Sequence, residues 1–188
     1  MKMKKTFFTL ITFFVTQITL AQKKNIDVNS STIKWTGKEI TTKTHYGLLK
    51  FKNGSLNVKD EVINGGSFVV DMTSLENQDL SGGSKDYLEK HLSSEDFFGV
   101  KQHPTASLTI NSAKKAKEGH QKVDSTLTIK GITHPISFDM IMTDEGATAN
   151  LVFDRSKYQV KFRSSTFFDD LGDKLIYDDI ELKVNLSF

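Results

Sequence analysis

The chain has 188 residues, and its 25 Lys and Arg against 23 Asp and Glu give a formal net charge of +2 at pH 7. It contains no cysteine, which excludes disulfide bonds, thiolate metal ligands and a lipidated N-terminal cysteine. Three lysines, Lys2, Lys4 and Lys5, lie in a segment that we expect to be removed, and the remaining chain then carries a net charge of about −1. This near balance provides no electrostatic argument for binding nucleic acid, and we expect no nucleic-acid partner.

Residues 1–21 have the layout of a cleaved secretory signal peptide. A basic start at 1–5 is followed by 15 uncharged residues at 6–20, and we expect cleavage before Gln22. An uncleaved membrane anchor is the alternative, but the uncharged run is shorter than the roughly 20 residues that span a bilayer. We therefore expect a periplasmic or secreted protein without a stable membrane anchor.

Apolar and polar residues alternate along most of the remaining chain, a pattern typical of β-strands that turn one face toward an interior. It predicts strands at 31–40, 46–52, 55–59, 66–73, 105–113, 121–130, 134–143, 147–154, 158–163 and 176–188. Because Asn and Gly tolerate the positive φ of tight hairpin turns, we expect turns at Asn53-Gly54, Asn64-Gly65, Gly119, Gly131 and Asp144–Gly146.

One helical segment, predicted at about 84–98, interrupts the strands. Ser84 can cap its N-terminus, and one face of it contains Tyr87, Leu88, His91 and Leu92. The segment could cover one end of a barrel, or it could only fill space. Internal repeats and linker-like stretches are absent from the sequence, so we predict a single domain over residues 22–188.

The strand pattern predicts an all-β protein, and its apolar stripe is the strongest functional candidate. Barrels of about eight strands can be packed solid or can hold one small ligand, and alternation alone does not distinguish the two. If the interior is hollow, the residues expected to line it are Ile33, Trp35, Leu49, Phe51, Phe68, Val70, Met72, Leu108, Ile110, Leu127, Ile129, Phe138, Met140, Phe153, Leu182 and Val184.

Five short motifs follow one another in a fixed order. They are Trp35-Thr-Gly37 with His45-Tyr-Gly47, Gly66–Met72, Leu88–Leu92 with Ser94–Phe98 and His103-Pro104, Leu127–Thr133, and Phe153–Ser156. This ordered set resembles the YceI-like family of lipid- or polyisoprenoid-binding proteins. Each motif alone is weak, but together they extend from about residue 27 to the C-terminus.

The resemblance implies an extended, lipocalin-like antiparallel β-barrel in the envelope of a Gram-negative bacterium. It also implies a role in sequestering or transporting an isoprenoid-type lipid, or another long-chain amphiphile, held in the lumen. A long tail is favoured, because each buried methylene contributes about 0.8 kcal/mol and association costs roughly 4–15 kcal/mol. A homodimer is possible.

Two polar residues are candidates for contact with the headgroup of such a ligand. His45 could provide a polar contact, or it could belong to a surface hairpin. Arg155 could bind a phosphate or carboxylate, because the guanidinium group forms bidentate hydrogen bonds; the alternative is a local ion pair with Asp154 or a cross-strand acid. His91 is expected to be a hydrogen-bonded packing residue.

No arrangement of catalytic residues is recognisable in the sequence. There is no Gly-x-Ser-x-Gly nucleophile turn, no phosphate-binding fingerprint around Gly82-Gly83, and no metal-ligand spacing among His45, His91, His103, His120 and His134. We therefore expect a binding protein rather than an enzyme, with no cofactor and no metal. Two alternatives stay open: a packed barrel that acts as an interaction module of the cell envelope, and an envelope enzyme.

Overall fold

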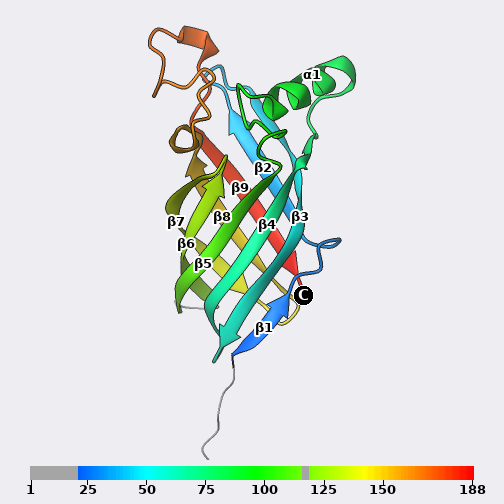
Figure 1. The fold of residues 1–188 in the computed structure, drawn as a ribbon, viewed down its shortest axis with the longest axis vertical. Coiled ribbons are helices and arrows are strands. Elements are labelled where there is room, and N and C mark those ends of the chain that lie inside the picture. Colours follow the sequence, from blue (N-terminus) through cyan, green and yellow to red (C-terminus); the bar gives the residue numbers. More distant parts are fainter. Residues whose placement is uncertain (1–20, 116–118) are drawn as a thin grey trace, which may run out of the picture.

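The computed structural model describes residues 21–115 and 119–188, which form a β-barrel with α1 and several loops at one end (Figure 1). In chain order the elements are β1 (Gln22–Asn25), β2 (Thr32–Lys38), β3 (Thr44–Lys59), β4 (Val62–Asn77), α1 (Gly82–Ser93), β5 (Thr105–Lys115), β6 (His120–Ile129), β7 (Ile132–Met142), β8 (Gly146–Asp154), the 3₁₀ turns η1 (Arg155–Tyr158) and η2 (Gly172–Lys174), and β9 (Asp179–Ser187). The predicted signal peptide at 1–21 lies almost wholly outside the described residues.

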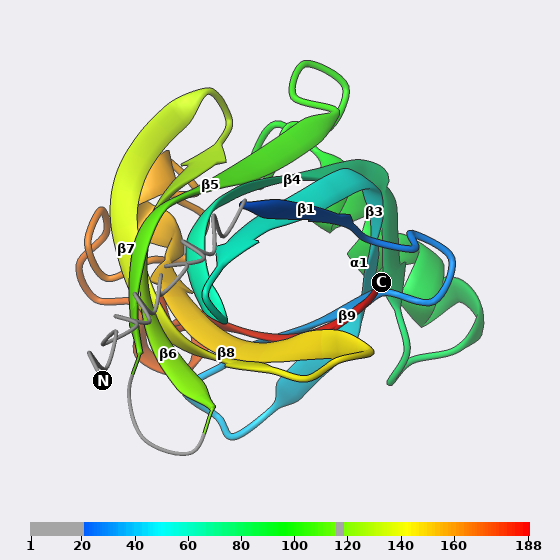
Figure 2. The same cartoon turned by 90° about the horizontal axis from the view of Figure 1, so that it is seen from below.

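Strands β2 to β9 close into an antiparallel barrel. Around the barrel the order is β3-β2-β9-β8-β7-β6-β5-β4, and pairing of β4 with β3 closes the ring (Figure 2). The short strand β1 pairs with the second half of β3, where Lys24 lies opposite Leu56. This arrangement confirms the predicted all-β antiparallel barrel with a short helical insertion.

The hairpin between β6 and β7 forms where the sequence predicts it. Ile129 pairs with Ile132 across Lys130-Gly131, whose φ angles of 51° and 74° are those of a two-residue type I′ turn. The alternating residues on either side therefore keep their register, so that Leu127 and Phe138 both lie in the buried interior.

The predicted turn at Asn53-Gly54 is wrong, because β3 continues through it. The register of β3 against β4 shifts between Phe51 and Asn53, which marks an irregularity inside one strand rather than its end. A Cβ atom on Gly54 would lie 2.5 Å from Cδ1 of Phe68. Glycine is therefore required here for close packing against a neighbouring side chain, not for a turn.

The turn predicted at Asn64-Gly65 is also misplaced. The chain reverses at Asp60-Glu61, whose φ angles are 52° and 63°, and Asn64-Gly65 lies within β4. The strand predicted at 158–163 is absent, because Arg155–Tyr158 form η1 and Gln159 follows with a φ of 58°. A left-handed residue at this point turns the chain away from the sheet.

Helix α1 is shorter than predicted and begins earlier. Its N-cap is Ser81 rather than Ser84, and it ends at Ser93. The predicted continuation to residue 98 is a set of turns, in which the N–H of Phe98 donates to the carbonyl of Leu92 and that of Gly99 donates to the carbonyl of Ser94.

The end of the barrel beside the β3–β4 turn is packed solid. Leu56, Ile63 and Val123 have no exposed surface there. The side chain of Gln121 joins β6 to this turn, because its Oε1 accepts from the N–H of Ile63 at 2.9 Å and its Nε2 donates to the carbonyl of Glu61 at 2.8 Å. This end therefore forms a closed floor.

Candidate functional site

Above the packed floor the barrel contains an apolar cavity of about 180 Å³, which is partly open to solvent. The lumen is therefore hollow over this part of its length rather than filled by side chains. All of the predicted lining residues except one lie on its wall, namely Ile33, Trp35, Leu49, Phe51, Phe68, Val70, Met72, Leu108, Leu127, Ile129, Phe138, Met140, Phe153, Leu182 and Val184.

The exception is Ile110, which does not lie on this wall. It pairs with Gly66 and Ser125, and it packs in the same buried cluster as Leu56, Ile63 and Val123. Its side chain points inward as the alternation requires, but at the level of the floor.

Sequence reasoning missed the residues that cover the other end of the cavity. Helix α1 and the turns after it contribute Leu88, His91, Leu92, Phe97 and Phe98 to the wall. The helical spacing of Leu88, His91 and Leu92, which places them on one face, is the sequence signal that could have identified them as lining residues. Other strand residues were also missed, among them Ala106, Ala149, Leu151, Ile180 and Leu186.

The cover over the cavity, which consists of α1 and residues 94–98, is attached to the rest of the protein by hydrogen bonds at two places. In the second half of α1, the Glu89 side chain accepts a hydrogen bond from the N–H of Asn77, the last residue of β4, at 2.7 Å. Beyond the end of α1, Nζ of Lys130 donates to the carbonyls of Phe97 and Gln159 at 2.9 and 3.2 Å. Burial lowers the pKa of Lys130, and the charge of Lys161 lowers it further.

His45 lies on the cavity wall and is paired with Asp79. Its Nδ1 is 2.7 Å from Oδ2 of Asp79, and Oδ1 of Asp79 accepts from the N–H of Tyr46 and the amide of Asn77. Burial alone would raise the pKa of Asp79, but the hydrogen bonds from Tyr46, His45 and Asn77 outweigh it and lower that pKa. His45 is thus held in position at the cavity, and its contact with a headgroup stays a prediction.

Arg155, the second candidate for a headgroup contact, does not lie on the cavity wall. It is completely buried, and its guanidinium donates to the carbonyls of Tyr177, Val160 and Ile176 at 3.1–3.2 Å. Its Nη2 also lies 3.2 Å from a carboxylate oxygen of Asp178. The structure shows the alternative, an ion pair with a nearby acid. The guanidinium group of Arg155 thus joins the segment around Val160 to residues 176–178.

His91 belongs to the cover, and three aromatic rings pack around its imidazole. The centroid of its ring lies 4.4 Å from that of Phe162, 5.7 Å from that of Phe97 and 6.5 Å from that of Tyr87. It packs as predicted, but its buried Nε2 has no hydrogen-bond partner. Burial lowers the pKa of His91 and the charge of Arg163 adds to this, while Asp96 opposes it.

The lowered pKa of His91 predicts that the fold loses stability as pH falls below 6.5, the ordinary value for this group. Between that value and the lower pKa of the folded state, the unfolded chain binds more protons than the folded chain. The free energy of unfolding therefore decreases as the pH is lowered. The substitution His91→Gln should flatten this dependence, as measured by urea unfolding at pH 7.5, 6.5 and 5.5. Equal slopes in the two proteins would contradict the assignment, and titration of Asp79 does not interfere, because its pKa lies below 3.8.

Within residues 21–115 and 119–188, no three His, Cys, Asp or Glu side chains are arranged to hold a metal ion. No helix in that same part of the chain combines the length and apolarity needed to cross a bilayer.

A closed antiparallel barrel of eight long strands, with an apolar cavity under a helical cover, defines a lipocalin-like protein. The family to which this chain belongs is the YceI-like family, whose domain model matches residues 25–188. The motifs quoted from the sequence therefore identify the family correctly.

Solved structures of low sequence identity share this fold. BcnA of Burkholderia cenocepacia superposes with a TM-score of 0.67 at 16% identity, covering 86% of this chain and 98% of its own. A polyisoprenoid binding domain from Saccharophagus degradans gives 0.58 at 12% identity, with 86% and 95% covered. The YCEI protein of Campylobacter jejuni gives 0.54 at 17% identity, with 99% and 98% covered.

Curated relatives match over shorter segments. A UPF0312 protein of Pseudomonas putida is 34% identical over 58 residues, which are 31% of this chain and 30% of the relative. A UPF0312 protein of Photorhabdus laumondii is 29% identical over 100 residues, 51% of each chain. The matched segments thus cover about a third to a half of these relatives.

Proposed function

We propose that this protein is a lipid-binding protein of the cell envelope, which holds a long apolar ligand of polyisoprenoid type inside its barrel. The observation that carries this proposal is the cavity, whose wall is built from aliphatic and aromatic side chains of β2 to β9. Uptake of an apolar molecule into such a space is favourable, because the apolar surfaces of the ligand and of the cavity wall are removed from water.

The shape of the cavity favours a long ligand over a compact one. Along β9 its wall extends from Ile180 to Leu186, a distance of about 20 Å at roughly 3.3 Å per residue. The packed floor closes one end, so an elongated tail would lie along the barrel with its polar end toward α1. The name of the Saccharophagus degradans protein, a polyisoprenoid binding domain, supports the same class of ligand for this fold.

The proposed location is the periplasm or the cell exterior. It rests on the basic and apolar pattern of residues 1–21. The cavity favours this proposal over a packed interaction module, because that alternative requires a barrel interior filled by side chains. A homodimer stays a prediction.

The test is to produce the full chain in a bacterial host that exports it, and to analyse an organic extract of the pure protein by mass spectrometry. We expect about one isoprenoid-type lipid per chain, and we expect the delipidated protein to rebind a C20 isoprenoid alcohol. Well-folded protein that contains no lipid in repeated preparations, and that does not rebind the alcohol, would overturn the proposal.

The same material tests the remaining enzyme alternative, which the half-buried pair of His45 and Asp79 on the cavity side keeps open. A lipid that is recovered chemically unchanged after long incubation with the protein supports binding without turnover. A product that forms with wild-type protein and not with the variant His45→Ala would instead indicate catalysis.

A further inference from the structure

The outer wall of the barrel carries three lysines close together on β3, β2 and β9. Lys34 of β2 lies directly opposite Lys183 of β9. On its other side Lys34 lies opposite Leu48 of β3, and Lys50 follows two residues further along that strand. All three lysines are exposed. Because like charges directly opposite each other on neighbouring strands repel, this lysine cluster (Lys34, Lys50 and Lys183) favours a negatively charged partner.

The acids that border the lysine cluster are engaged elsewhere. Glu181, on the same face of β9, forms an ion pair with Lys38. Asp71, which is paired with Lys50 in the register of β3 and β4, accepts from the N–H and the hydroxyl of Thr73 at 2.9 and 2.6 Å. Within residues 21–115 and 119–188, none of the three lysines forms an ion pair. Their charge is therefore available to a partner.

The opening of the cavity lies at one end of this same wall. Lys38, the last residue of β2, belongs to the cavity wall and is exposed to solvent, and Glu39 and Ile176 beside it are half-buried wall residues. The packed floor closes the opposite end of the barrel. The mouth of the cavity (Lys38, Glu39 and Ile176) thus lies next to the neighbouring strands β2 and β9, at the end that carries α1 (Figure 1).

Two exposed apolar side chains border this mouth. Ile40 is 43% exposed and Tyr177 is 46% exposed. Backbone hydrogen bonds of 3.0 Å hold both residues in place, because the N–H of Ile40 donates to the carbonyl of Leu175 and the N–H of Tyr177 donates to that of Lys38. Tyrosine is amphipathic and is enriched where proteins meet the surface of a bilayer. The mouth therefore has an apolar rim (Ile40 and Tyr177), and the lysine cluster lies along the wall beside it.

We propose that the protein docks through this rim and the lysine cluster to a lipid bilayer that contains anionic phospholipids. The lysines contact lipid phosphates, and the rim enters the interface with the mouth facing the bilayer. This inference rests on the proposed function and adds to it the surface from which the ligand is taken or to which it is delivered. A bilayer is favoured over an acidic protein, because the apolar side chains surround the opening through which an apolar ligand would pass.

The expected contact is weak and reversible. Each lysine near an anionic membrane strengthens binding about 5-fold, so three lysines together contribute roughly 100-fold. Membrane binding of this kind grows with the buried apolar area and with the attraction to anionic lipids. Such a contact suits a carrier that must leave the membrane again after it has exchanged its ligand.

The experiment measures binding of the full chain to vesicles by co-sedimentation. One set of vesicles contains phosphatidylethanolamine and phosphatidylglycerol, and the other contains only phosphatidylcholine. The wild type should bind the anionic vesicles and should dissociate as the salt concentration rises from about 0.1 M to about 1 M, because the screening length falls from about 10 Å to about 3 Å. Binding to phosphatidylcholine should be weaker by about 100-fold.

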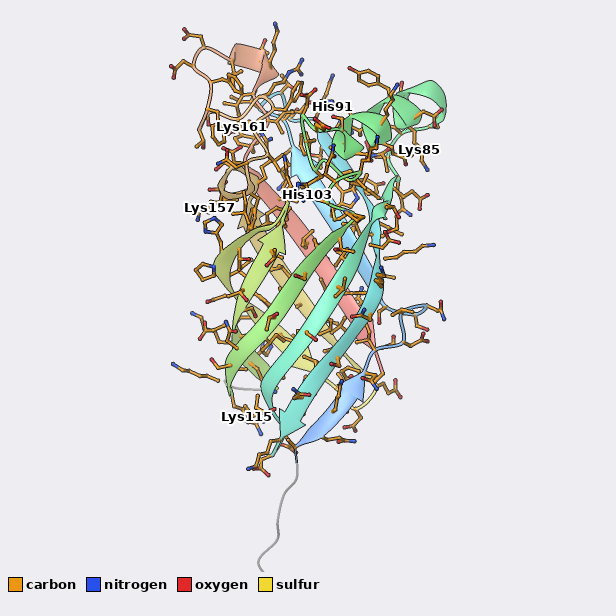
Figure 3. All side chains as sticks on the ribbon, viewed as in Figure 1. Lys85, His91, His103, Lys115, Lys157 and Lys161 are labelled. Carbon is orange, nitrogen blue, oxygen red and sulfur yellow. The ribbon has the colours of Figure 1, made fainter. Side chains whose placement is uncertain are left out.

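Two double variants locate the contact on the barrel. Lys34→Gln with Lys183→Gln should weaken binding to anionic vesicles about 10- to 30-fold. The matched control is Lys114→Gln with Lys122→Gln, since these exposed lysines also lie opposite each other. They lie near the floor, where Figure 3 shows the adjacent Lys115 at the end of the barrel away from α1. Because both double variants remove two positive charges, the control should change binding by less than about twofold if position decides the effect.

A third double variant tests the rim. Ile40→Ser with Tyr177→Ser removes apolar surface from the mouth without changing the charge, and it should weaken binding to the anionic vesicles at least about 5-fold. The sensitivity to salt should remain, because the lysine cluster is intact.

The contrary outcomes separate the docking surface from the proposed function. A wild type that does not bind anionic vesicles overturns the docking proposal, and the proposed function stands if lipid is still recovered from the same protein. Equal losses in the two lysine variants would show a general attraction and would overturn the assignment to this wall. Vesicle binding that persists unchanged at about 1 M salt would exclude the role of the lysines.

Discussion

Replacing Arg155 with methionine is expected to lower the free energy of unfolding by about 3–5 kcal/mol. The side chain is completely buried, and methionine would leave three backbone carbonyls and the carboxylate of Asp178 without their shared partner. Each buried acceptor that loses its partner costs about 1–3 kcal/mol, and the buried carboxylate adds to this. Urea unfolding followed by circular dichroism measures the loss.

The effect should extend to the cover of the cavity. The guanidinium of Arg155 lies 5.3 Å from the ring centroid of Phe97, which is a wall residue, and it binds carbonyls between Val160 and Tyr177. The matched control is Arg163→Met, which removes the other arginine and its contact with Phe162 and should cost no more than about 1 kcal/mol. A loss below about 1 kcal/mol for Arg155→Met would contradict the structural role that we assign to Arg155.

Replacing Ala149 with phenylalanine is expected to lower the affinity for lipid by at least about tenfold. Ala149 lies on the cavity wall, between Met140 of β7 and Val184 of β9, so a phenyl ring there would occupy space that the ligand needs. Displacing two methylenes of the ligand already costs about 1.6 kcal/mol, at about 0.8 kcal/mol each, and this corresponds to roughly a tenfold change in affinity.

The control is the neighbouring outward position. Thr148→Phe adds the same ring to an exposed site on the same strand and should leave affinity unchanged. Because the ring of Ala149→Phe enters a hollow space, the fold should persist with a loss of stability at or below the usual 1–3 kcal/mol of overpacking. Binding of the isoprenoid alcohol by folded Ala149→Phe with wild-type affinity would show that the ligand does not use this cavity.

The period of two along the chain was sufficient to predict the fold class and nearly all of the inward-facing residues. In a strand, successive side chains point to opposite faces, so local sequence alone decides that Leu182 and Val184 share a face. The turn at Lys130-Gly131 was equally local, because its two residues must adopt positive φ. The order of the motifs identified the family by the same kind of local information.

The errors in the strand boundaries have a different cause. Asn53-Gly54 and Asn64-Gly65 satisfy the local requirements of a turn, but pairing with neighbouring strands keeps both in extended segments. The chain reverses instead at Asp60-Glu61, where neither residue is glycine or asparagine. Cross-strand pairing overrides local preference here, and it is not visible in a window of a few residues.

The sequence by itself determined which side chains face the interior, since that depends only on alternation along each strand. Whether they meet in the middle was decided by the tertiary structure, because the width of a barrel depends on how all its strands pair and tilt. The same is true of the polar residues: Arg155 is engaged by Asp178 and by carbonyls up to 22 residues away, and Nε2 of His91 is unpaired only because α1 folds over the open end. Such contacts join distant parts of the chain, and no local pattern encodes them.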